Sequence, residues 1–272
     1  MGCPLNCIWC HNPEGISEKA LLSYSNDKCS GCGACVRICP EVHGMENSKH
    51  LMNRKNCNHC FKCVEVCPVN ALEQVGREMD TTEVFEAVTR DKRYYETSGG
   101  GITVSGGEPM RQFSFTYAVL EACKTAGINT AMETSGFAPK AQFKQILPQV
   151  DTFLYDIKEL NPEKHKEYTG ADNSLILNNL AFLAGKGNKI IVRCPVIPGL
   201  NDRIDHFTGL AELSQKYDSI EGIEIMPYHK LGVSKSVRMG LAKQNNYDQP
   251  DVETVTEWNK IIESAGGKIV KY

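Results

Sequence analysis

The cysteines of this chain are arranged in a way that few folds can accommodate. Eleven of the thirteen cysteines precede residue 68, and they form three groups with two or three residues between neighbours. Cysteines this close in sequence would be strained as disulfide partners of one another. Thiolates select zinc, copper(I) or iron–sulfur clusters. The distribution therefore predicts metal sites in a protein of the reducing cytoplasm.

The first group is Cys3, Cys7 and Cys10, with the spacing C-x3-C-x2-C. A 4Fe–4S cluster is usually held by four cysteines, so three of them leave one iron open to a ligand that is not protein. A structural zinc site needs four protein ligands, and His11 would complete such a site. The spacing alone allows both kinds of site.

The second and third groups repeat one motif, C-x2-C-x2-C-x3-C-P, which is typical of bacterial ferredoxins with two clusters. The fourth cysteine of each motif ligates the other cluster. The expected 4Fe–4S ligand sets are therefore crossed: Cys29, Cys32, Cys35 and Cys67 for one cluster, and Cys57, Cys60, Cys63 and Cys39 for the other. Two zinc ribbons are the alternative, but the usual long spacer is missing and the Cys-Pro endings stay unexplained. Residues 41–56, between the motifs, are polar and expected to form a loop.

The composition is that of a globular protein. The 272 residues suffice for one large domain with an insert, and 41% of them are hydrophobic. A net charge of −3 gives no reason to expect nucleic acid or a membrane as a partner. No apolar run is long enough to cross a bilayer, and no signal peptide is evident. We expect a loop with the first metal site at 1–22, a ferredoxin-like insert at 23–77 and an α/β part at 78–272.

Strand and helix patterns alternate after residue 79. Strands are expected at 102–105, 129–132, 152–157, 189–196 and 222–226, with one more at 266–272. Helices are expected at 82–96, 113–126, 174–184, 205–217 and 251–265. This alternation predicts a parallel α/β sheet, whose ligands bind beyond the carboxyl ends of the strands.

Polar motifs stand at the ends of these strands. Gly106-Gly107-Glu108 follows the first strand, and Asp156 and Lys158 stand at the end of the third. Strand alternation places Asp156 and Lys158 on one face, so both can contact one ligand. Each motif also has a simpler interpretation, as a plain turn or as an exposed ion pair of little energetic value. Several of these motifs converge on one edge of the expected sheet, at the carboxyl ends of its strands, and this convergence favours an active site there.

The residues around the first cysteine group carry a family resemblance. The string Gly-Cys-Pro-Leu-x-Cys-x-Trp-Cys-x-Asn-Pro-Glu, from Gly2 to Glu14, resembles the glycyl radical enzyme activating enzymes of the radical S-adenosylmethionine superfamily. The resemblance implies a partial (β/α)6 barrel with an inserted two-cluster ferredoxin-like domain. It also implies that S-adenosylmethionine (SAM) binds the open iron and is cleaved reductively. The resulting 5′-deoxyadenosyl radical would install a glycyl radical on a partner enzyme.

The resemblance further implies cofactor contacts and a monovalent-cation site. The residues implied to contact SAM are Trp9, Cys10, His11, Gly106, Gly107, Glu108, Asp156, Ile157, Lys158, Glu159, Arg193 and His229. The cation site would be formed by Glu133, Thr134 and Asp156, although an Asp is common in the family where Glu133 stands. Cys123 and Cys194 match no motif and are expected to be ordinary buried thiols.

The expected cofactors are three 4Fe–4S clusters, SAM and the cation. The expected partners are a glycyl radical enzyme and, as electron donor, a ferredoxin or flavodoxin. Pyruvate formate-lyase activases typically lack such an insert, so the partner implied is of the dehydratase, decarboxylase or carbon–nitrogen-cleaving type. A peptide maturase with auxiliary clusters is an alternative, but its extra cysteines usually lie near the C-terminus. A ferredoxin-like electron carrier is another alternative, but such a carrier would not need the large α/β part.

One element of the resembled family has no counterpart in this sequence. In that family a first barrel strand precedes the cysteine loop, but here only Met1 and Gly2 precede Cys3. We therefore expect the sheet to begin with the strand at Ile102 and to expose its edge. Our hypothesis is that Met1 is an internal methionine of a longer reading frame, and the alternative is a natural variant that does without the strand.

Overall fold

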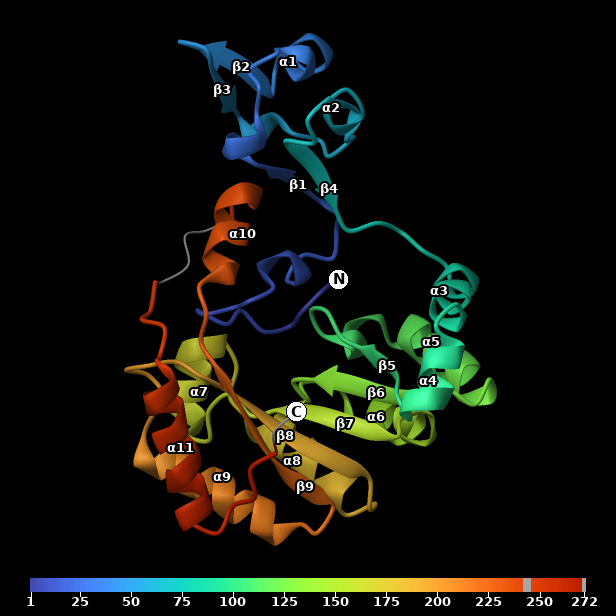
Figure 1. Cartoon of the computed structure of the whole chain (residues 1–272), viewed down its shortest axis with the longest axis vertical. Coiled ribbons are helices and arrows are strands. Elements are labelled where there is room, and N and C mark those ends of the chain that lie inside the picture. Colours follow the sequence, from blue (N-terminus) through green and yellow to red (C-terminus); the bar gives the residue numbers. More distant parts are fainter. Residues whose placement is uncertain (242–245, 271–272) are drawn as a thin grey trace.

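A five-stranded parallel sheet underlies the C-terminal part of the chain, with its strands in sequence order (Figure 1). The computed structural model describes residues 1–241 and 246–270. The strands of this sheet are β5 (Gly101–Val104), β6 (Asn129–Thr134), β7 (Thr152–Asp156), β8 (Lys189–Val196) and β9 (Ile220–Pro227). Parallel strands are covered on both faces, and six of the eight residues of β8 are accordingly buried. The α/β fold expected from the sequence is confirmed.

Helices separate the strands and cover the sheet. They are α3 (Thr81–Thr89), α4 (Lys92–Ser98), α5 (Phe113–Thr125), α6 (Lys140–Ile146), α7 (Pro162–Thr169), α8 (Ser174–Ala184), α9 (Ile204–Lys216), α10 (Leu231–Met239) and α11 (Val252–Ser264). Their core contains Phe143, Phe153 and Leu180, each without exposed surface. The single helix expected at 82–96 is instead two helices, α3 and α4, separated at residues 90–91.

The ferredoxin-like insert lies at the far end of the molecule from α9 and α11 (Figure 1). It is closed by the antiparallel pair of β1 (Leu21–Tyr24) and β4 (Leu72–Val75). Two short 3-10 turns, η2 (Asn26–Lys28) and η3 (Arg54–Asn56), each precede a cysteine motif. The helices α1 (Ala34–Ile38) and α2 (Lys62–Glu65) each lie within one motif. The sequence repeat is therefore also a structural repeat.

The loop prediction for residues 41–56 is wrong. This segment contains a hairpin of β2 (His43–Glu46) and β3 (Lys49–Met52). Asn47 and Ser48 between them have φ of 47° and 62°, and positive φ at both positions is the geometry of a type I′ hairpin turn. The two strands carry histidine, methionine and charged residues where β-branched residues would have marked them as strands.

The sheet begins at β5, as expected from the sequence. Among the described residues β5 has one strand neighbour, β6, so its other edge is open. At the other side of the sheet, Ile269 forms a parallel bridge with Ile223 of β9. Residues 271–272 of the strand expected at 266–272 lie outside the described residues. None of the described helices has both the length and the apolar character that crossing a membrane requires.

Candidate active site

The first cysteine group lies at the carboxyl ends of the strands, in a cavity of about 140 Å³. The predicted site residues that line it are Cys3, Cys7, Trp9, Cys10, His11, Gly106, Gly107, Glu133, Thr134, Asp156 and Lys158. The predicted residues that do not line it are Glu108, Ile157, Glu159, Arg193 and His229. Ser105, Ser135, Pro195 and Met226 also line it, and sequence reasoning missed them.

Residues 1–16, here called the cysteine loop, are held by backbone hydrogen bonds to distant parts of the chain. The Gly2 carbonyl accepts from the Glu108 N–H at 2.8 Å, and the Ile8 N–H donates to the Tyr168 carbonyl at 3.0 Å. The Trp9 ring packs against the Tyr168 ring, with centroids 5.4 Å apart. The protein therefore positions the loop against the turn after β5 and against α7.

The three thiols of the cysteine loop suit a soft metal centre. None of them is in a disulfide. Burial raises the pKa of Cys7 to about 12, and burial also raises the pKa values of Cys3 and Cys10. Without a metal these buried groups keep their protons, and a bound metal replaces them because the thiolate is the ligand. Three sulfurs around one cavity fit a 4Fe–4S cluster with one open iron.

Asp156 and Lys158 form an ion pair inside this cavity. Lys158 Nζ lies 2.7 Å from Asp156 Oδ2, and the two side chains are 12% and 14% exposed. Burial alone lowers the pKa of Lys158, but Asp156 and the Cys7 and Cys3 sulfurs outweigh it and raise that pKa. Asp156 Oδ1 is buried without a hydrogen-bond partner in the described structure. Such an acceptor suits a polar group of a ligand.

His11 and His229 form a stacked pair beside the cavity. Their ring centroids are 3.9 Å apart and their planes differ by 21°. Burial, followed by the proximity of His229, lowers the pKa of His11 to about 4, so its ring is neutral at pH 7. His11 Nε2 and His229 Nδ1 are buried and lack partners among residues 1–241 and 246–270. Both nitrogens are therefore available to a ligand.

Glu108 joins two neighbouring strand ends. Its Oε1 accepts from Thr134 Oγ1 at 2.8 Å, and its Oε2 accepts from the Ser135 hydroxyl and N–H at 2.6 and 2.8 Å. Burial raises the pKa of Glu108, although these hydrogen bonds oppose the shift. Glu108 thus fixes the turn after β5 to the turn after β6.

Arg193 on β8 lies between two carboxylates. Its Nη1 is 3.0 Å from Glu133 Oε1, and its Nε is 2.8 Å from Glu224 Oε2. The second oxygen of Glu133 accepts from Ser105 Oγ at 2.6 Å. Both oxygens of Glu133 are occupied, so a monovalent cation at this position would compete with Arg193 for them.

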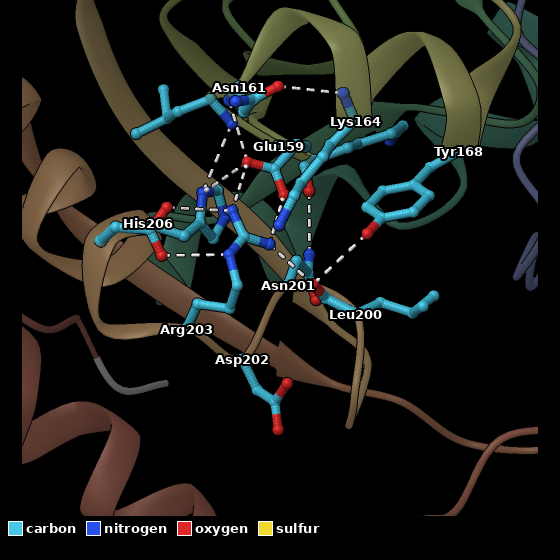
Figure 2. Close-up of polar contacts among 12 residues, drawn as sticks. Glu159, Asn161, Lys164, Tyr168, Leu200, Asn201, Asp202, Arg203 and His206 are labelled. Carbon is cyan, nitrogen blue, oxygen red and sulfur yellow. Dashed lines mark hydrogen bonds and ion pairs between the residues drawn. The ribbon is translucent and has the colours of Figure 1, made fainter.

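Glu159, which follows the end of β7, lies in a buried polar network (Figure 2). Its oxygens lie 3.0 and 3.1 Å from Arg203 Nη1 and Nη2, and the residue is 1% exposed. Asn201 Nδ2 donates to the Lys158 carbonyl at 2.8 Å. The network joins the end of β7 to the loop after β8 and so fixes the backbone at Lys158. Sequence reasoning missed Arg203 and Asn201, although the Pro-Gly-Leu-Asn-Asp segment after β8 marked this loop.

Glu159→Gln is expected to lower the free energy of unfolding at neutral pH by about 2–3 kcal/mol, because it breaks a buried ion pair. Burial alone raises the pKa of Glu159, but Arg203 and the Asn161 N–H outweigh it and hold that pKa below its usual value. The stabilisation is therefore present above the usual carboxyl pKa and is lost as pH falls through the lower pKa of the folded state. Thermal unfolding midpoints measured from about pH 6 down to about pH 2 should fall more steeply in the unmodified protein than in the variant.

Asp205→Asn is the matched control for this change. Asp205 Oδ1 lies 3.0 Å from Nε of the same Arg203, but its side chain is 68% exposed. Exposed ion pairs contribute less than about 1 kcal/mol, so this variant should differ little from the unmodified protein. Equal losses of stability in both variants would contradict the importance of the buried pair.

One of the two crossed cysteine groups lies around a single cavity of the insert. Cys29, Cys32, Cys35 and Cys67 line this apolar cavity. This group thus draws Cys67 from the second motif. Burial, followed by the proximity of Cys57, raises the pKa of Cys63 to about 11, and Cys39 and Cys60 add to the shift.

Helix α10 connects the insert to the cysteine loop. Arg54 of the insert donates to the carbonyls of Leu22 and Arg238, the latter near the end of α10. Lys235 of α10 donates to Asn12 Oδ1 at 2.8 Å and to Glu14 Oε1 at 2.7 Å. One helix therefore holds the insert and the cysteine loop in a defined arrangement.

Two family models match the chain. The model of the radical SAM superfamily matches residues 53–211, and the model of the 4Fe-4S dicluster domain matches residues 21–68. The choline trimethylamine-lyase activating enzyme of Oleidesulfovibrio alaskensis is 42% identical over 246 residues, which cover 88% of this chain and 79% of that protein. The trans-4-hydroxy-L-proline dehydratase activating enzyme of Clostridioides difficile is 37% identical over 270 residues, 97% of this chain and 89% of that protein.

Solved structures share the fold. A domain of a pyruvate-formate lyase-activating enzyme from Bacteroides vulgatus is 25% identical, with a TM-score of 0.53 over 63% of this chain and 98% of that chain. Streptococcus suis SuiB, bound to its precursor peptide, is 14% identical, with a TM-score of 0.59 over 99% of this chain and 46% of that chain. At that identity the likeness to SuiB shows the fold alone.

Proposed function

Since this chain belongs to the activating enzymes of glycyl radical enzymes, within the radical SAM superfamily, we propose that it cleaves SAM in the cavity beside Cys3, Cys7 and Cys10. The enzyme class uses reductive SAM cleavage to generate a glycyl radical on a partner enzyme. One observation supports the site above others: three cysteine thiols, none of them in a disulfide, share a cavity with the Asp156–Lys158 pair. A bound cluster would supply the electron, and these side chains would orient SAM and exclude water.

The proposed roles follow from the donors that the site offers. Cys3, Cys7 and Cys10 would hold the cluster. Asp156 Oδ1, which has no partner among the described residues, would accept from a polar group of SAM. Glu108 and Glu159 would act indirectly, by fixing the backbone of the lining residues. The monovalent cation at Glu133, Thr134 and Asp156 remains part of this proposal, in competition with Arg193 for Glu133.

Two ferredoxin-type clusters in the insert are also proposed, on the crossed cysteine sets, with a ferredoxin or flavodoxin as electron donor. The proposed bounds are 1–22 for the loop, 23–77 for the insert and 78–272 for the α/β part. The pairing of β1 with β4 supports the insert bounds. A cytoplasmic location is proposed from the thirteen cysteines, which form no disulfide.

The proposed partner is a glycyl radical enzyme of the dehydratase, decarboxylase or carbon–nitrogen-cleaving type. The relatives of this chain include the activating enzymes of a choline trimethylamine-lyase and of a trans-4-hydroxy-L-proline dehydratase. A groove of about 1530 Å³ runs along the open edge of β5 to Gly107 and Glu108, beside the SAM cavity. It would give a segment of the partner access to the cavity.

Anaerobic incubation of the iron-loaded protein with SAM and a low-potential reductant tests the activity. The protein should release 5′-deoxyadenosine, and with its partner present it should produce a glycyl radical signal in electron paramagnetic resonance (EPR). A ferredoxin-like carrier would release no 5′-deoxyadenosine. SAM cleavage with a peptide substrate but no radical on any glycyl radical enzyme would favour a maturase.

Cys39→Ala is expected to disturb the cluster on Cys57, Cys60 and Cys63, because the fourth cysteine of each motif serves the other cluster. The iron content should fall while the signal of the Cys29 set persists. EPR spectra of the reduced variant make this measurement. A loss confined to the Cys29 set would show that the ligation is not crossed.

Lys158→Ala and His229→Ala are expected to weaken SAM binding by at least about tenfold, or ~1.4 kcal/mol, with near-normal iron content. The Lys158 side chain lines the cavity and the His229 ring stacks on His11 beside it, but neither residue is a cluster ligand in this proposal. Equilibrium binding of SAM to the iron-loaded variants makes this measurement. Lys144→Ala, an exposed lysine on α6, is the control. A loss of iron with unchanged SAM affinity would show that these two residues have a structural role instead.

A further inference from the structure

The β2–β3 hairpin lies against the Cys29, Cys32, Cys35 and Cys67 cavity. Met45 pairs with His50 and His43 pairs with Met52, so these four side chains share one face of the hairpin. Met45 and His50 line the cavity directly. The hairpin therefore covers this site with Met45 and His50, and His43 and Met52 lie beside them on the same face.

The two histidines are buried and bonded to each other. His43 and His50 are 2% and 9% exposed, and His43 Nδ1 lies 2.9 Å from His50 Nε2. The outer nitrogens, His43 Nε2 and His50 Nδ1, are buried and have no hydrogen-bond partner in the described parts of the chain. Buried polar atoms usually have a hydrogen-bond partner, so these two nitrogens are positioned to contact a water, an ion or a ligand.

A cysteine sulfur lies within reach of the pair. Cys35 Sγ and one ring nitrogen of each histidine all lie within 4.8 Å of one another. Even when both rings are neutral, the pair carries two N–H groups, and only one of them lies between the rings. In either tautomer, one N–H therefore remains at an outer nitrogen.

We propose that the His43–His50 pair donates a hydrogen bond to a sulfur of the cluster on Cys29, Cys32, Cys35 and Cys67, and thereby raises its reduction potential. Reduction adds negative charge that the sulfurs share, so an N–H···S hydrogen bond stabilises the reduced state more than the oxidised state. This inference rests on the proposed cluster ligation. It makes the two insert clusters unequal, because one is held against the histidine pair and the other is not.

The histidine near the other cysteine set offers a contrast. His59 stands between Cys57 and Cys60, is exposed, and its Nδ1 lies 3.0 Å from the Ala20 carbonyl. That contact directs the ring to the backbone of Ala20, the residue directly before β1. His59→Phe is therefore the matched control.

EPR-monitored redox titration tests the proposal on the full chain in a C3A/C7A/C10A background, where only the insert clusters give signals. His50→Phe keeps the bulk of the ring and removes its N–H. The midpoint potential of one of the two clusters should become more negative by about 59 mV. For a one-electron couple this shift corresponds to a tenfold change in the ratio of reduced to oxidised cluster. The other midpoint should not move. His50→Asn keeps a donor near the position of Nδ1, so its midpoint potential should return most of the way to that of the unmodified protein. His59→Phe should change neither midpoint potential.

Three results would overturn the proposal. The first is an unchanged midpoint in His50→Phe with full iron content. The second is loss of one cluster in both His50 variants, which would make His50 a ligand. The third is a stoichiometric metal other than iron in the unmodified protein, which would make Cys35, His43 and His50 a separate metal site. SAM cleavage by the unmodified protein tests the proposed function independently of all three.

Discussion

The triple variant Cys3→Ala, Cys7→Ala, Cys10→Ala is expected to release no measurable 5′-deoxyadenosine, a loss of at least about a thousandfold. These three side chains are the thiols that line the cavity, so their removal leaves the site without the proposed cluster ligands. The iron content should fall from about twelve to about eight atoms per chain, because the insert keeps its own cysteines. Iron analysis and chromatography of the reaction products make the two measurements.

Cys123→Ala is the control for this variant. Cys123 is a fully buried cysteine of α5, outside the three groups. Its replacement should leave both the iron content and SAM cleavage near their normal values. Full SAM cleavage by the triple variant would refute the assignment of the active site to the cysteine loop.

Gly107→Ala is expected to displace the cysteine loop. A Cβ atom at Gly107 would overlap the backbone carbonyl oxygens of Gly2 and Gly15. These atoms cannot move aside as a flexible side chain can, because the Gly2 carbonyl also accepts the Glu108 N–H at 2.8 Å. A shift of the order of 1 Å at a reacting group can cost about a hundredfold in rate. We therefore expect SAM cleavage to fall at least about a hundredfold, with partial loss of iron.

Gly44→Ala is the control for the glycine change. A Cβ at Gly44, in β2, meets nothing within 4 Å, and the backbone there is not left-handed. This variant should have normal iron content and normal SAM cleavage. Normal cleavage by Gly107→Ala would show that the turn after β5 does not hold the cysteine loop.

Much of the site could be predicted because its signals are local. The spacing of Cys3, Cys7 and Cys10 confines three sulfurs to one short loop, whatever the rest of the chain does. Strand periodicity placed Asp156 and Lys158 at a strand end, and the structure puts both in the cavity. The hairpin at 41–56 was missed because its strands lack β-branched residues, and the two helices α3 and α4 were merged because their periodicity continues across the break.

The sequence by itself determined the metal chemistry and the α/β class, since ligand spacing and hydrophobic period are properties of neighbouring residues. Only the tertiary structure decided which polar groups pair. Arg54 contacts the Arg238 carbonyl 184 residues away, and Arg193 lies between carboxylates from β6 and β9. The His43–His50 pair depends on the register of the hairpin. Such pairings follow from strand register and from competition among partners in a low-dielectric interior, neither of which local sequence encodes.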